Sequence, residues 1–132
     1  MLIDNEETVA DLEATWEHLR MRDGWQKPGG ADDQQVLFMT TCMETWIVAD
    51  RSTLADHYGQ ALQVAALLPL NDLEKRARDD VQDKLVHATK HCSNAYAKGK
   101  RSFKILGKLD PATLEMHLPS FSRARRILKE KL

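Results

Sequence analysis

The pattern of apolar and polar positions predicts two short strands in the first third of the chain. Residues 1–3 are apolar and lead directly into the polar run 4–7, which is typical of a buried strand that delivers carboxylates to its carboxyl end. Residues 36–41 form a second apolar, β-compatible run. The loop 22–34, rich in Gly, Pro and Asp, precedes this second run. We therefore expect one strand on each side of a helix and a loop.

Helical periodicity is clearest in two segments. Apolar residues recur every three or four positions over 8–21, where Thr8 is a candidate N-cap, and again over 73–91. Between them, residues 43–47 share an apolar helical face, and residues 60–73 read as a connection. The chain thus has about six expected helices, most of them after the second strand.

Capping residues mark the shorter helices. Asp50 is expected to cap a helix over 51–58, which Gly59 closes. Ser102 is expected to cap a helix that runs to Leu109, and a last helix should follow Pro119. The pair at 110–111, Asp-Pro, is expected to start only a short turn. The predicted fold class is α/β and helix-rich, with a small sheet followed by a C-terminal helical region.

A length of 132 residues suits a single domain, with a sheet-bearing part over 1–60 and a helical part with a basic tail over 61–132. Two strands alone make a marginal sheet. Either further strands come from a partner chain, or an N-terminal portion is absent. The partner could be a second copy of this chain, in a homo-oligomer formed through the sheet edge. A third alternative is that the native protein is longer at its N-terminus.

Composition excludes several protein classes. No apolar run approaches the roughly 20 residues that a membrane span needs, and no leader opens the chain, so we expect a cytoplasmic protein without a membrane partner. Cys42 and Cys92 stand 50 positions apart outside any zinc motif and are expected to be buried thiols. Kinase, hydrolase and dehydrogenase signatures are absent.

Charge is segregated along the chain despite a net charge of -1. Residues 1–92 hold nine Lys and Arg against 17 Asp and Glu, whereas residues 93–132 hold ten against three. A basic tail of this kind favours either a phosphate-facing surface or neutralisation of the acidic half within the fold.

Several segments together resemble a bacterial family of uncharacterised proteins, domain of unknown function 4276, which is similar to Toprim-like nuclease domains. The resemblance is strongest in the Met-Glu-x-Trp block that begins at Met43 and in the Tyr-x-Lys-Gly block that begins at Tyr96. The matching segments, in the family's order, are 2–7, 16–19, 22–25, 42–50, 88–90, 96–106 and 109–111. The chain corresponds to the C-terminal two-thirds of such a protein and lacks the usual N-terminal portion, with its Glu-bearing first strand.

The resemblance implies a partial Toprim-like sheet of two to three strands in a prokaryotic protein. It also implies a metal-dependent nuclease that uses Mg²⁺ or Mn²⁺ to cleave phosphodiester bonds in nucleic acid. Because Toprim-containing nucleases work with ATPase partners, an ATPase partner protein and a role in defence against foreign DNA are expected on the same ground. The alternative is a non-catalytic protein–protein interaction module or a truncated remnant.

Three carboxylates are the candidate metal ligands and catalytic residues. Asp4 and Glu6 alternate at a strand end, where carboxylate oxygens suit Mg²⁺. Glu44 lies in an apolar stretch, where a carboxylate needs a cation or a hydrogen-bond donor. The competing interpretations are that the polar run 4–7 only favours the start of the next helix, and that Glu44 forms a salt bridge with the basic tail.

Three cations are the candidate phosphate ligands. Lys98, Lys100 and Arg101 flank Gly99 just before an expected helix, where cationic side chains and free backbone N–H groups meet. The alternatives are solvated loop charges, or charges that neutralise the acidic half of the chain.

Overall fold

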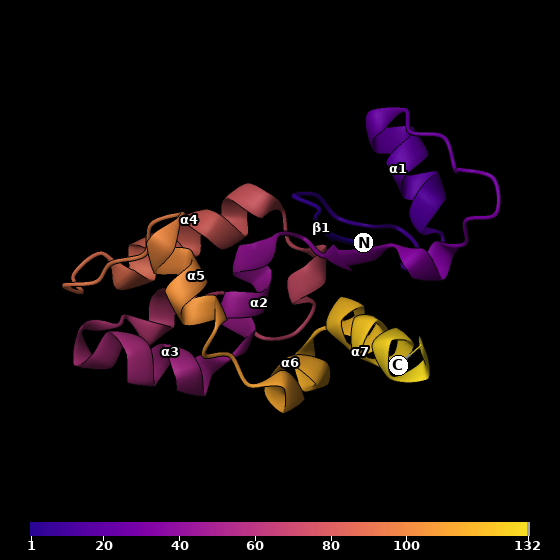
Figure 1. Ribbon diagram of the computed structural model, residues 1–132. Coiled ribbons are helices and arrows are strands. Elements are labelled where there is room, and N and C mark those ends of the chain that lie inside the picture. Colours follow the sequence, from indigo (N-terminus) through magenta and orange to yellow (C-terminus); the bar gives the residue numbers. More distant parts are fainter. Residues whose placement is uncertain (132) are drawn as a thin grey trace.

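The computed structural model describes residues 1–131 and contains a two-stranded parallel sheet (Figure 1). Strand β1 (Leu2–Asp4) pairs with β2 (Leu37–Met39), and Leu2 lies opposite Leu37 in the register. Both expected strands are confirmed, and both are apolar runs that end where polar residues begin. With the helices around them they give a helix-rich α/β fold.

The helices are α1 (Thr15–Asp23), α2 (Met43–Ala49), α3 (Arg51–Tyr58), α4 (Arg78–Thr89), α5 (Lys100–Leu106), α6 (Pro111–His117) and α7 (Pro119–Lys131). Short 3₁₀ turns cover Asp33–Gln35, Gly59–Ala61, Val64–Ala66 and Leu73–Lys75. Within residues 1–131, no helix is both long and apolar enough to cross a membrane.

The two faces of the sheet pack against different helices. Ile3 and Phe38 point to one face and pack with Leu19 of α1. Leu37 points to the other face and packs with Ala124 and Ile127 of α7. Side chains alternate across a strand, so even this small sheet has a helix on each side.

Helix α2 lies at the centre of the main core, with α3, α4, α5 and α6 around it (Figure 1). All of its residues are buried, including Glu44. Cys42 and Cys92 are buried free thiols in this core, as the sequence predicted. A carboxylate inside a buried helix must find a partner in the core or in a cleft that reaches it.

Several predicted helix ends are confirmed. Asp50 caps α3 and accepts a hydrogen bond from the backbone N–H of Thr53 at 3.1 Å. Gly59 follows α3 with a φ of 73°, a left-handed value that favours glycine. The last helix begins at Pro119 as expected.

Other helix boundaries differ from the prediction. Helix α1 begins at Thr15, so residues 8–14 are not helical and Thr8 is not its cap. Helix α4 begins at Arg78, because residues 73–75 form a separate 3₁₀ turn. Ser102 lies inside α5, where its hydroxyl accepts the N–H of Gly99 at 3.0 Å. The Asp-Pro pair at 110–111 starts α6 and not merely a short turn.

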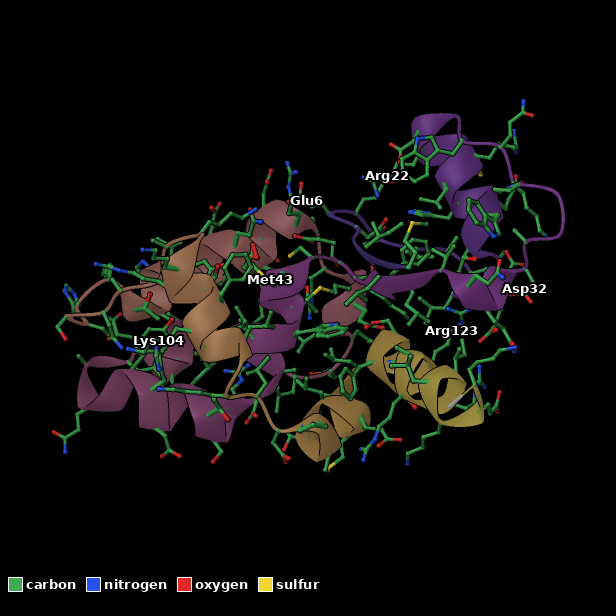
Figure 2. All side chains as sticks on the ribbon, viewed as in Figure 1. Glu6, Arg22, Asp32, Met43, Lys104 and Arg123 are labelled. Atoms are coloured by element: carbon green, nitrogen blue, oxygen red, sulfur yellow. The ribbon has the colours of Figure 1, made fainter. Side chains whose placement is uncertain are left out.

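Part of the basic tail is tied to the acidic half. Arg123 is buried on α7 and donates to the backbone oxygens of Val36 at 2.9 Å and Asp33 at 2.8 Å. It also forms an ion pair with Glu13 at 3.2 Å. Figure 2 shows Arg123 on the side of α7 that faces the segment containing Asp32. Neutralisation within the fold therefore accounts for this part of the charge split.

Candidate functional site

The candidate site forms where both strands end. Asp4 is the last residue of β1, and its Oδ1 accepts the backbone N–H of Met43, the first residue of α2, at 3.1 Å. The parallel pairing makes this contact possible because it places the carboxyl ends of both strands at one edge. Asp4 thus satisfies a free N–H at the start of the helix that carries Glu44.

Glu6 reaches the same place through a turn. Its φ of 63° is left-handed, an uncommon conformation for a residue with a side chain. Its Oε2 pairs with Arg78 at 2.9 Å, and its Oε1 pairs with Lys98 at 3.2 Å. In Figure 2 Glu6 lies on the upper side of the molecule, above Met43. The pairs join the turn after β1 to α4 and to the segment before α5.

Glu44 forms the buried floor of the site, with 0% exposure. Its Oε1 accepts a hydrogen bond from Gln82 at 2.7 Å and lies 3.7 Å from the Nζ of Lys98. The hydroxyl of Tyr96 lies against this carboxylate, and burial, the charge of Glu44 and a hydrogen bond to Glu44 raise the pKa of Tyr96. Two neutral donors and one ammonium at 3.7 Å therefore compensate the fully buried carboxylate, so its charge is only partly neutralised.

The pKa directions indicate that these groups interact. Burial raises the pKa of Asp4, and the charges of Glu6 and Glu44 add to this, while the bond from Met43 opposes it. Burial opposes the ionisation of Glu6, but hydrogen bonds from Lys98 and Arg78 outweigh burial and lower its pKa. Burial also opposes the charge of Lys98, yet its bond to Glu6 and the nearby carboxylates raise its pKa.

The predicted phosphate ligands are only partly brought to this cluster. Lys98 lies in it, but Arg101 donates to the backbone oxygen of Ala95 at 2.9 Å, and Lys100 has no ion pair or side-chain hydrogen bond with the described residues. Arg78 and Gln82, which do contact the cluster, were missed by the sequence analysis. In the sequence, these two residues are marked only as polar residues of a helix, and most other residues of α4 are polar as well.

The three carboxylates approach one another without forming a ready metal site. Among residues 1–131, no group of three or more Asp, Glu, His or Cys side chains is arranged to hold a metal ion. The ammonium of Lys98 lies between Glu6 and Glu44 instead. The donor chemistry nevertheless suits Mg²⁺, because all candidate ligands are hard carboxylate oxygens. A metal-binding role stays a prediction.

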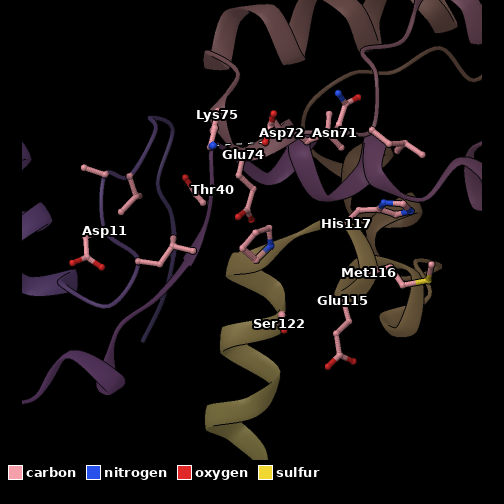
Figure 3. A pocket seen from close by; sticks show the side chains of 16 residues that line it. Asp11, Thr40, Asn71, Asp72, Glu74, Lys75, Glu115, Met116, His117 and Ser122 are labelled. Atoms are coloured by element: carbon pink, nitrogen blue, oxygen red, sulfur yellow. Dashed lines mark ion pairs between the residues drawn. The ribbon is translucent and has the colours of Figure 1, made fainter.

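A cavity of about 910 Å³, away from the acidic cluster, lies beside the start of α7 (Figure 3). Glu74 points toward that helix end and accepts the backbone N–H of Ser120 at 2.9 Å, as well as a hydrogen bond from its hydroxyl. Burial raises the pKa of Glu74 to about 7, although the bonds from Ser120 act in the opposite direction. Because this carboxylate already has its partners, it is a cap for α7.

Comparison with known proteins identifies a family. The family model described as "Domain of unknown function (DUF4276)" matches residues 1–128. No curated protein and no solved structure matches the chain.

Proposed function

The chain belongs to this family of domains of unknown function, and from that premise we propose that it is a Toprim-like module that cleaves phosphodiester bonds of nucleic acid with Mg²⁺ or Mn²⁺. The observation that carries the proposal is the meeting of Asp4, Glu6, Glu44 and Lys98 at the carboxyl ends of two parallel strands. Open α/β sheets bind their ligands at this edge.

Asp4, Glu6 and Glu44 would hold the divalent ion. When bound, the ion supplies positive charge at the phosphoryl oxygens of the substrate. Glu44 is the fixed ligand, because it is buried and its Oε1 is held by Gln82. Asp4 is oriented by its bond to the start of α2, and its Oδ2 has no hydrogen bond or ion pair with the described residues.

Lys98 and Arg78 would contact the phosphate backbone beside the carboxylates. Both side chains are about half exposed and are held only by carboxylates, so they can turn toward an anionic substrate. Lys100 and Arg101 would extend the basic surface along α5. A role in defence against foreign DNA, with an ATPase partner protein, belongs to the proposal on the resemblance alone.

The test is a calorimetric titration of Mn²⁺ into the wild type and into Asp4→Ala/Glu6→Ala. The matched control is Asp56→Ala/Asp83→Ala, which removes two exposed acids outside the cluster. Saturable binding that only the first double variant loses supports the metal site. Plasmid cleavage that needs Mg²⁺ or Mn²⁺ and disappears in Glu44→Gln then tests the activity. A chain that binds no metal would rule out an autonomous nuclease.

A second candidate is a non-catalytic interaction module, favoured by the open edge and apolar groove near β1. A cavity of about 630 Å³ is lined by Leu2, Leu37, Trp46, Phe121 and Leu128. Leu2 is 54% exposed on a strand whose outer edge has no neighbour within the described chain. If a second copy pairs there, light scattering should give twice the chain mass for the wild type and the monomer mass for Leu2→Glu, with no dependence on metal.

A further inference from the structure

Lys98 occupies the position where the proposed metal ion would meet two of its ligands. Its Nζ lies 3.2 Å from Oε1 of Glu6 and 3.7 Å from Oε1 of Glu44. Arg78 pairs with the other oxygen of Glu6 at 2.9 Å. Both oxygens of Glu6 are therefore engaged by side-chain cations of the chain itself.

A divalent ion and this ammonium cannot share the same oxygens. Mg²⁺ binds carboxylate oxygens at roughly 2.0–2.1 Å, so an ion that bridges Glu6 and Glu44 would occupy the space that the ammonium fills. A divalent ion and an ammonium group that contacted the same carboxylates would also repel each other. Entry of the metal thus requires Lys98 to leave.

The partners differ in their freedom to move. Glu44 is fully buried, whereas the side chain of Lys98 is 55% exposed and ends a flexible four-carbon stem. Lys98 is therefore the movable member of the pair, and Glu44 is the fixed one.

Lys98 compensates the charge of the buried Glu44 carboxylate incompletely, because its ammonium lies 3.7 Å away. Gln82 and Lys98 both contact Oε1, and the Tyr96 hydroxyl, which is neutral, is the remaining donor beside the carboxylate. An ion with a double charge that contacts both oxygens would compensate the buried group more fully than one ammonium at 3.7 Å.

We infer that Lys98 is an internal competitor for the metal ion: it closes the acidic cluster when no divalent ion is bound, and its release by the ion makes it available to a phosphate group. The inference rests on the proposed function. It adds that metal binding and phosphate binding are coupled through one side chain, so that each favours the other.

The experiment is a calorimetric titration of Mn²⁺ into the wild-type chain, Lys98→Met and Lys100→Met. Lys98→Met keeps the length of the stem and removes the competing charge, so its Kd for Mn²⁺ should fall by about fivefold or more. Lys100→Met makes the same change in net charge two residues away, outside the cluster, and should stay within about twofold of the wild type. Lys98→Arg retains a cation and should not gain affinity.

The outcomes separate the two proposals. Tighter binding in Lys98→Met, including binding that is measurable only in that variant, supports the competition. Metal binding in the wild type that Lys98→Met leaves unchanged or weakens overturns the competition while the proposed metal site stands. An absence of binding in every variant, with circular dichroism spectra that match the wild type, overturns both.

Discussion

The buried carboxylate of Glu74 should make the stability of the protein fall as pH rises through neutrality. Glu74 accepts two hydrogen bonds from Ser120 at the start of α7, yet burial raises its pKa to about 7 from an ordinary value of 4.5. The folded state therefore holds a proton that the unfolded state releases at lower pH. The stabilisation is complete below about pH 4.5 and is lost as pH rises through about 7.

The magnitude follows from the difference between the two pKa values, which corresponds to roughly 3 kcal/mol. Two histidines act in the opposite direction. Burial lowers the pKa of His18 and of His57, so each of them destabilises the fold as pH falls below its ordinary pKa. A comparison with a variant that lacks only the Glu74 carboxyl removes their contribution.

The assay is urea unfolding, followed by circular dichroism at pH 5 and pH 8, for the wild type and Glu74→Gln. The amide keeps an acceptor for Ser120 but does not titrate. From pH 5 to pH 8 the wild type should lose roughly 2–3 kcal/mol more than Glu74→Gln. Glu130→Gln, an exposed site on α7, should behave like the wild type. An equal pH dependence in the wild type and Glu74→Gln would refute the reasoning.

Three further predictions concern the free energy of unfolding, measured by chemical denaturation. Arg123→Met should cost about 2–4 kcal/mol because two backbone carbonyls lose a charged donor, whereas the exposed Arg126→Met should cost about 1 kcal/mol or less. Leu85→Ala in the main core should cost about 2–5 kcal/mol, and the half-exposed Val86→Ala less than about 1 kcal/mol. Asp50→Ala should cost about 2 kcal/mol, since this buried carboxylate caps α3 and accepts the N–H of residue 110.

The elements that could be predicted are those defined by local chemistry. Both strands are short apolar runs with polar residues after them, and the parallel pairing follows from the helix between them. The cap at Asp50 and the break at Gly59 require only neighbouring residues. The convergence of Asp4 with the start of α2 also follows, because parallel strands end at one edge.

The boundaries that failed are set by contacts with distant residues. Residues 73–77 fit the apolar stripe of α4, but the hydroxyl of Thr41 donates to the backbone oxygens of Glu74 at 3.2 Å and Arg76 at 2.6 Å. These oxygens are thus engaged outside a helix. Similarly, Thr40 donates to the backbone oxygen of Glu7 at 3.0 Å, which fixes the turn after β1 and delays α1. Periodicity alone contains no information about such partners.

The charged residues show why the competing interpretations of the sequence could not be separated. Arg123 and Arg126 pair with Glu13, which makes them intramolecular partners of the acidic half. Lys98 pairs with the acidic half as well, but its partners are the carboxylates expected to bind metal, and its exposed stem allows it to leave. In the inference proposed above, neutralising the acids and contacting phosphate would be two positions of this one side chain, and a divalent ion in the cluster would decide between them. A residue with both roles would show the sequence features of a phosphate ligand and of an ion-pair partner, so the sequence alone cannot separate the two interpretations of Lys98.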